Sequence, residues 1–147
     1  MTDSNASTSL AFVFPGQGSQ SVGMLAELSE LHPVIRGTFD EASEGAGVDL
    51  WALSQAAPEA QPNATEYTQP ALLAAGVAVW RLWQQKGGVQ PSVLAGHSLG
   101  EYTALVAAQA LTLRDAAHLV RIRGPLMQAA SPTGTGALAA ELAAGAA

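Results

Sequence analysis

The sequence of 147 residues predicts an α/β fold with a parallel sheet. The expected elements follow the order strand, helices, strand, helix, helix, which is typical of that class. The two expected strands are short, largely apolar runs at residues 10–14 and 92–95, delimited by proline or glycine. A turn of the pattern GxSxG lies between the second strand and the helix after it.

The first half of the chain is expected to hold one strand and three helices. The strand at 10–14 ends at Pro15 and is followed by the glycine-rich loop PGQGSQ. Pro33 separates the first two helices, and Gly45 and Gly47 are expected to stop the second. The predicted helices cover residues 24–31, 34–44 and 50–55, and a loop covers 56–67.

The clearest helical pattern begins at Thr68-Gln69-Pro70. Thr68 is expected to cap the first turn, where Pro70 is tolerated because the N–H groups there have no intrahelical partner. Apolar side chains cover most of the circumference of this helix, so we expect it to be buried on more than one side. Gly87-Gly88 end it before the second strand.

Two helices are expected after the GxSxG turn, over residues 101–110 and about 113–127. Thr112 and Asp115 have the spacing of a capping box at the start of the second helix. Pro125 lies inside that helix and removes one N–H from it, so a kink near Arg123 is expected.

The domain organisation predicted from these elements has three parts. Residues 1–9 are polar and are expected to be a disordered N-terminus, and residues 10–133 form the α/β unit. Residues 134–147 lack strand-forming residues and a helix cap, so they are interpreted as an interrupted element. Because stable sheets usually contain more than two strands, we expect the chain to be part of a larger unit.

Composition excludes several classes of function. The formal net charge is −6 with six Lys and Arg residues, whereas nucleic-acid binding requires clustered cations. There is no cysteine, and His32, His97 and His118 lack the spacing of metal ligands, so neither a metal nor another cofactor is expected. No signal peptide and no membrane-spanning run is recognised, and a cytoplasmic protein is expected.

The motif GHSLG at residues 96–100 is the first candidate for chemistry. A strand before it and a helix after it are the context of a nucleophile elbow, in which a sharp turn exposes the serine. Glycines at 96 and 100 avoid collisions at such a turn. The free N–H groups of the following helix can stabilise negative charge on an attacked carbonyl. Ser98 is therefore the predicted nucleophile.

Four motifs together resemble the malonyl-CoA:acyl-carrier-protein transacylases, the stand-alone malonyltransferases of bacterial type II fatty-acid synthesis. They are FVFPGQGSQ at 12–20, YTQPAL at 67–72, GHSLGEY at 96–102 and Arg123-Gly124. The resemblance covers about residues 10–140 and corresponds to the N-terminal half of a family member. It implies part of an α/β-hydrolase-like large subdomain, which ends before or at a ferredoxin-like small subdomain.

The resemblance also implies a reaction and its residues. Ser98 takes a malonyl group from coenzyme A as an ester and passes it to the phosphopantetheine thiol of acyl carrier protein. The backbone N–H groups of Gln17 and Leu99 form the oxyanion hole. Arg123 pairs with the malonyl carboxylate, which a planar guanidinium can bind through two parallel hydrogen bonds. Malonyl-CoA and acyl carrier protein are the expected partners.

Four further polar residues have alternative or structural interpretations. Arg121 lies two positions before Arg123, so the two point to different faces of the helix, and Arg121 is interpreted as solvated. His97 lies in or near the family's substrate site, and orienting the elbow by hydrogen bonding is an equal alternative. Gln69 belongs to a family motif or simply begins a helix, and His118 is interpreted as an exposed structural residue.

The general base that activates the serine has no candidate in this sequence. In the family it is a histidine well downstream of the arginine, and neither His32 nor His118 lies in a motif that substitutes for it. We therefore expect the 147-residue polypeptide to transfer little or no malonyl group by itself.

Three alternatives to a stand-alone malonyltransferase stay open. An α/β-hydrolase or thioesterase shares GHSLG, although the GQGSQ loop and Arg123 argue against it. A polyketide-synthase acyltransferase domain is the nearer alternative, and the residues that best separate it lie beyond Ala147. The third is an inactive fragment that binds acyl carrier protein or nothing.

Overall fold

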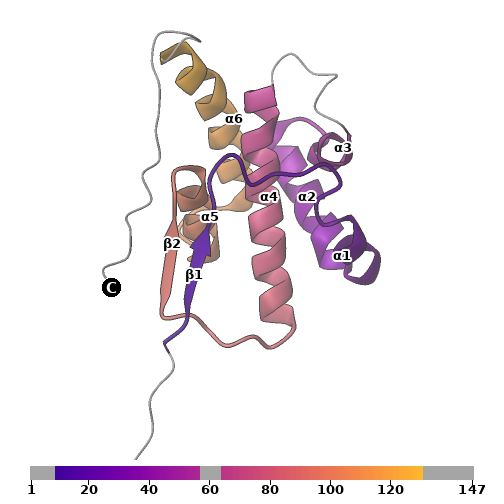
Figure 1. The fold of residues 1–147 in the computed structure, drawn as a ribbon, viewed down its shortest axis with the longest axis vertical. Helices are drawn as coiled ribbons and strands as arrows, with labels where there is room; N and C mark the ends of the chain where they lie inside the picture. Colours follow the sequence, from indigo (N-terminus) through magenta and orange to yellow (C-terminus); the bar gives the residue numbers. More distant parts are fainter. Residues whose placement is uncertain (1–8, 57–63, 131–147) are drawn as a thin grey trace, which may run out of the picture.

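The computed structural model describes residues 9–56 and 64–130. Two parallel strands lie beside a group of helices, and the long α4 runs through the middle of the molecule (Figure 1). This arrangement confirms the α/β class and the parallel sheet. The elements in chain order are β1 (Ala11–Phe14), α1 (Ala26–Leu31), α2 (Pro33–Ala46), α3 (Leu50–Gln55), α4 (Ala64–Gln85), β2 (Val93–Gly96), α5 (Leu99–Ala107) and α6 (Leu113–Ala130).

The sheet places the ends of both strands next to each other. Ala11 pairs with Val93 at one end, and Phe14 pairs with Gly96 at the other. Alternate side chains of β1 point to opposite faces, so Phe12 and Phe14 pack toward the helices while Val13 is 71% exposed. The Phe12 ring lies edge-on to Trp80 of α4, with centroids 5.2 Å apart. These aromatic contacts attach the strands to α4.

The main core lies between α2, α4 and α6 rather than under the sheet. It is made of aliphatic and aromatic side chains with almost no exposure, many of them small enough for helices to approach closely. Its most buried members include Ile35, Phe39, Leu73, Val77, Ala116 and Val120. The prediction that α4 is buried on more than one side is confirmed, since it contacts α2, α5 and α6 as well as the strand aromatics.

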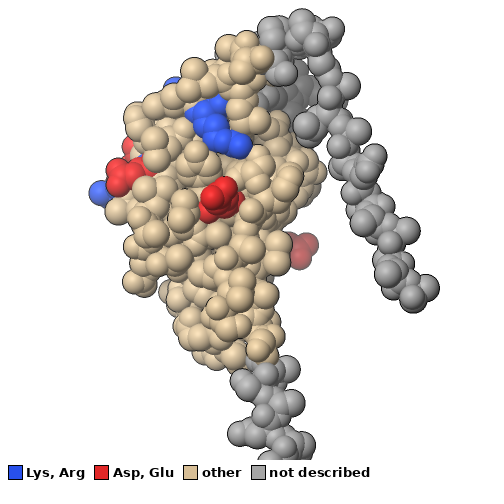
Figure 2. All heavy atoms as spheres, turned by 90° about the vertical axis from the view of Figure 1, so that its left-hand side faces the viewer, with Lys and Arg blue, Asp and Glu red and all other residues tan. Residues whose placement is uncertain are grey.

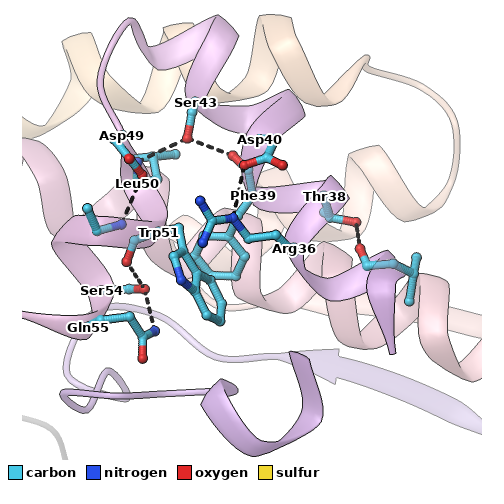
Figure 3. A network of polar contacts seen from close by, with 12 residues as sticks. Arg36, Thr38, Phe39, Asp40, Ser43, Asp49, Leu50, Trp51, Ser54 and Gln55 are labelled. Carbon is cyan, nitrogen blue, oxygen red and sulfur yellow. Dashed lines mark hydrogen bonds and ion pairs between the residues drawn. The ribbon is translucent and has the colours of Figure 1, made fainter. Parts of the chain in front are cut away.

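The junction between α2 and α3 is held by short polar contacts (Figure 3). The Ser43 hydroxyl donates to the carbonyl of Phe39 at 2.7 Å and accepts from the Leu50 N–H at 3.0 Å. Asp49 caps α3 by accepting from the Ala52 N–H at 2.9 Å. Because these bonds satisfy helix-end groups locally, the short α3 keeps a fixed place against α2.

Two predicted helix boundaries in the middle of the chain are wrong. Helix α4 begins at Ala64, so Thr68 is not at its start and the buried Pro70 lies in its interior. The extra turn is held by a distant residue, since Glu66 accepts from Arg121 of α6 at 3.2 Å. Gly45 does not stop α2 and lies within it, where a Cβ would overlap the backbone of Arg114. Its role is close approach to the start of α6.

The last two helices agree in position with the prediction but differ at their ends. Helix α5 begins at Leu99, directly after Ser98, and ends at Ala107. The capping pair is confirmed, because the Asp115 N–H donates to the Thr112 hydroxyl at 3.1 Å. Helix α6 continues through Pro125 to Ala130. The expected parts at 1–9 and 134–147 lie outside the described residues, apart from the exposed Ser9.

No helix in the described part of the chain is long and apolar enough to cross a membrane.

Candidate active site

Ser98 lies at a sharp turn between the end of β2 and the start of α5. Its φ and ψ are 53° and −110°, in a region that a residue with a side chain rarely adopts. Such a conformation costs about 1–3 kcal/mol and persists when the surrounding structure enforces it. The predicted strand–turn–helix context of the GHSLG motif is therefore confirmed, and the serine side chain is exposed.

Glycines at 96 and 100 allow the backbone to close around this turn. A Cβ on Gly96 would overlap the backbone of Gly100, and a Cβ on Gly100 would overlap the carbonyl of Phe14. The His97 N–H donates to the Phe14 carbonyl at 3.1 Å, which ties the turn to the end of β1. The strained serine is thus held by main-chain contacts from both strands.

The glycine-rich loop after β1 lies against the same turn. A Cβ on Gly16 would be 3.0 Å from the His97 carbonyl oxygen and 3.8 Å from Ser98 Cβ. Within the loop, the Ser19 hydroxyl donates to the Gly16 carbonyl at 3.0 Å. The Gly18 N–H donates to the side-chain oxygen of Gln20 at 2.8 Å. Gln17 therefore directly follows a residue, Gly16, that lies against the elbow.

Arg123 of α6 reaches Ser98, which lies 25 positions earlier in the chain. Its Nη2 donates to Ser98 Oγ at 2.8 Å, and its Nη1 donates to Gln69 Oε1 at 2.8 Å. The guanidinium carbon lies 5.8 Å from the centre of the Tyr102 ring. Despite Pro125 in the next turn of α6, the guanidinium and the serine hydroxyl are direct hydrogen-bond partners.

Arg121 is not the solvated residue that the sequence suggested. It is half-buried, its Nε donates to Glu66 Oε1 at 3.2 Å, and its Nη1 donates to the carbonyl of Ala46. These contacts join α6 to the start of α4 and the end of α2. A spacing of two residues does place the two arginines on different faces of α6. The partners of Arg121, Glu66 and the Ala46 carbonyl, lie 55 and 75 positions away and could not be recognised from local sequence.

The remaining expected site residues also lie at the elbow. Leu99 is the first residue of α5, where a backbone N–H has no acceptor within the helix. His97 is exposed and contacts β1 through its backbone, while its imidazole Nδ1 lies beside Gly16. His118 is on an exposed face of α6.

Sequence reasoning missed the residues that surround the guanidinium. Gln69 is fully buried, and its Nε2 donates to Met127 Sδ at 3.7 Å. Tyr102 follows the serine by one helical turn and faces the arginine. Gln69 and Tyr102 belong to the motifs YTQPAL and GHSLGEY, which indicated that they are near the site but did not predict these contacts.

The surface on the strand side of the molecule is sparsely charged (Figure 2). Four of the cationic side chains are in ion pairs elsewhere, namely Arg36, Arg81, Arg114 and Arg121. Arg123 forms no ion pair with a described residue, so its charge is available to an anionic ligand. Within 9–56 and 64–130, no three His, Asp or Glu side chains gather as a metal site.

Comparisons with known proteins agree with this geometry. A family model described as an acyl transferase domain matches residues 11–146. The malonyl CoA-acyl carrier protein transacylase of Salmonella typhimurium is 58% identical over 133 residues, which are 90% of this chain and 43% of that protein. The chain therefore spans less than half the length of this curated relative.

Solved structures are similar over the same part. The malonyl-CoA:acyl carrier protein transacylase of Xanthomonas oryzae pv. oryzae is 77% identical with a TM-score of 0.81, over 86% of this chain and 40% of that one. Another match is the structure of a type II polyketide-synthase acyl-carrier protein in complex with its malonyl-transacylase. Its identity is 58% and its TM-score 0.81, over 86% of this chain and 41% of the matched chain. With the family match over nearly its whole length, the chain belongs to the acyl transferase domain family.

Proposed function

We propose that this chain carries the acyl-binding part of a malonyltransferase, in which Ser98 accepts a malonyl group from malonyl-CoA. Ser98 Oγ attacks the thioester carbonyl, the carbon–sulfur bond breaks, and coenzyme A leaves as its thiol. The thiol of the phosphopantetheine arm of acyl carrier protein then takes the malonyl group from the seryl ester. The observation that carries this proposal is the 2.8 Å hydrogen bond from Arg123 to Ser98 Oγ.

Arg123 supplies selectivity for a dicarboxylic acyl group. In a malonyl ester, one carbonyl and one methylene separate the ester oxygen from the carboxylate. A guanidinium that reaches Ser98 Oγ is therefore close enough to turn toward a carboxylate at that distance. Its planar donors match a carboxylate in a bidentate pair, which a lysine at the same place would not reproduce.

The charge that develops on the attacked carbonyl needs donors beside Ser98. The Leu99 N–H is supplied by the first turn of α5, and its position after a strained serine is the usual one for this role. The second donor is the N–H of Gln17, supported by the contact of its neighbour Gly16 with the elbow. Loss of one such donor lowers the rate by about 10²–10³ in comparable enzymes.

The general base is proposed to come from the part of the relatives that this chain does not span. No histidine in the described ranges hydrogen-bonds to Ser98 Oγ, whose side-chain partner is Arg123. His97 precedes the nucleophile and is proposed to line the substrate site, where its imidazole borders the Gly16 loop.

The finer domain assignment is also a proposal. Residues 10–133 are proposed to be the first part of an α/β-hydrolase-like large subdomain, and 134–147 the start of the small subdomain. Support comes from a family match over 11–146 and a span of 43% of the Salmonella relative. Acyl carrier protein is the proposed acceptor, because a similar transacylase is solved in complex with one. A cytoplasmic location stays a prediction.

A chimera tests the proposed function with a general base present. Residues 1–130 are joined to the corresponding remainder of the Salmonella relative, and transfer of malonyl from malonyl-CoA to holo acyl carrier protein is followed by intact mass. We expect turnover that Ser98→Ala abolishes and Ser29→Ala leaves unchanged, since the Ser29 hydroxyl donates to the Ala26 carbonyl within α1. The polypeptide of residues 1–147 without the added part should show little or no turnover.

Two results would reject the proposal. One is a chimera that keeps its turnover after Ser98→Ala, because another group would then carry the acyl chain. The other is hydrolysis of simple esters with no acyl transfer from malonyl-CoA, which would favour the thioesterase alternative.

A further inference from the structure

Gln69 is a buried polar side chain at the centre of the contacts around Arg123. It is 0% exposed although it lies on α4, far in sequence from both of its side-chain partners. Buried amides are costly unless their donors and acceptors are used. Both ends of this amide are bonded, to Arg123 Nη1 at 2.8 Å and to Met127 Sδ at 3.7 Å.

The chemistry of the two partners fixes the direction of the amide. A guanidinium has donors and no acceptor, so the Gln69 side chain must present its oxygen to Arg123. A thioether is an acceptor only, so the NH₂ group must face Met127. Since both partners lie on α6, one turn apart, they prevent the amide from flipping.

Tyr102 restricts the guanidinium from a third direction. Its ring centre is 5.8 Å from the guanidinium carbon, and the aromatic face attracts the positive charge. With Nη1 held by Gln69, the donor that remains beside the nucleophile is Nη2, which lies 2.8 Å from Ser98 Oγ. One edge of the guanidinium is anchored and the other faces the reacting atom.

We propose that Gln69 is a positioning residue that holds Arg123 toward Ser98 and leaves its charge free for an acyl carboxylate. The inference rests on the proposed function. A neutral acceptor is essential to it, because a carboxylate at position 69 would bind the same guanidinium and cancel the charge that the substrate needs. Selectivity between malonyl and acetyl groups therefore depends on a residue that does not touch the acyl chain.

Two variants of Gln69 distinguish the effect of cancelling the Arg123 charge from the effect of losing the orientation of its guanidinium. Gln69→Glu keeps the shape and an acceptor but pairs with Arg123, and it also turns an oxygen toward Met127 Sδ. Gln69→Leu removes both hydrogen bonds at similar volume. Gln84→Glu is the matched control, since Gln84 is an exposed residue of the same helix. The measured quantity is the ratio of Ser98 acylation rates from malonyl-CoA and acetyl-CoA, followed by intact mass in the chimera described above, which supplies a general base.

We expect Gln69→Glu to lower the malonyl-to-acetyl ratio about 10- to 100-fold, the effect of losing the charged hydrogen bond between Arg123 and the malonyl carboxylate. Gln69→Leu should lower it about tenfold, and Gln84→Glu should leave it unchanged. The rate with acetyl-CoA should change little in each variant, which a general loss of folding would not produce. A malonyl preference that survives Gln69→Glu within twofold overturns the inference while the proposed function stands.

A spectroscopic readout decides the inference even if the chimera is acylated by neither thioester, the result that would count against the proposed function. In the ¹⁵N-labelled chain, the Nη–H signals of Arg123 are assigned by their loss in Arg123→Lys. We expect slow rotation and resolved signals in the wild type and in Gln84→Glu, and averaged signals in Gln69→Leu. Met127→Leu, at a half-exposed site, should give intermediate averaging because the amide loses one partner. Identical Arg123 signals in wild type and Gln69→Leu would refute the positioning role.

Discussion

Side chains hold together the helical layer of α2, α4 and α6, whereas direct backbone contacts hold the elbow around Ser98. Helix α6 contributes a residue to each region. In the layer of α2, α4 and α6, small and aliphatic side chains fill the space between helices. At the elbow, backbone approaches backbone with no side chain between, as at Gly96 and Gly100. Arg121 of α6 joins the layer, and Arg123 of the same helix reaches Ser98 at the elbow.

This difference indicates that the helical layer mainly provides stability, whereas the elbow mainly fixes the geometry of Ser98. Packing of many side chains tolerates modest changes at any one position, since neighbours can adjust. Main-chain contact has no such freedom, and it fixes a serine in a conformation that costs free energy. Substitutions at paired positions in the two regions should therefore have effects of different size and kind.

The largest difference is expected between two glycines. Gly100→Ala places a Cβ into the carbonyl of Phe14, so we expect the free energy of unfolding to fall by about 3 kcal/mol or more. Gly37→Ala, on an exposed face of α2 with no atom within 4 Å of the new Cβ, should raise it by about 0.5–1 kcal/mol. Urea unfolding followed by circular dichroism measures both, and equal effects would contradict the contrast.

Arg123 is expected to control selectivity rather than stability. Arg123→Ala removes the guanidinium beside Ser98, so the preference for malonyl-CoA over acetyl-CoA should fall about 100-fold. Single-turnover acylation measures this preference, with Arg121→Ala as the matched control on the same helix. If the control lost the same selectivity, the separate roles of the two arginines would be wrong.

Arg121 is expected to control stability. Its two contacts hold the first turn of α4 and the last turn of α2, and both ion-pair partners are partly shielded from water. Arg121→Ala should lower the free energy of unfolding by about 1–2 kcal/mol, which includes a discount for partial solvent exposure. Denaturant titration at low and high salt checks this, and no loss of stability would show that the contacts contribute nothing measurable.

The smallest expected effect is at the start of α6. The Thr112 hydroxyl accepts from the Asp115 N–H at 3.1 Å and donates to its carboxylate at 2.7 Å. Thr112→Ala should lower the free energy of unfolding by about 1 kcal/mol, whereas Thr112→Ser keeps the cap and should change it by a few tenths. A loss as large in the serine variant as in the alanine variant would rule out the hydroxyl as the cause.

Local chemistry was enough to predict the strands and the elbow. Apolar runs before Pro15 and Gly96 predicted both strands, and the spacing of glycines around Ser98 predicted the turn, because a tight turn demands those residues itself. The capping pair at the start of α6 was likewise visible from spacing alone.

Long-range contacts were the part that the sequence could not supply. The start of α4 was placed four residues late, since Glu66 is held by Arg121 from another helix. Gly45 looked like a helix end but is a point of contact with α6. Family resemblance assigned Ser98 and Arg123 to one site but did not predict their direct hydrogen bond. The contact of Gln69 with Met127 depends on side chains 58 positions apart.

The most direct test of the central claim is a competition between two thioesters for one hydroxyl. The chimera that adds the general base is incubated with equal amounts of malonyl-CoA and acetyl-CoA, and the peptide that contains Ser98 is weighed after digestion. We expect a malonyl adduct on Ser98 in large excess over acetyl, which Arg123→Ala reduces. Equal labelling by both groups, or an adduct on a different residue, would contradict the role assigned to Ser98 and Arg123.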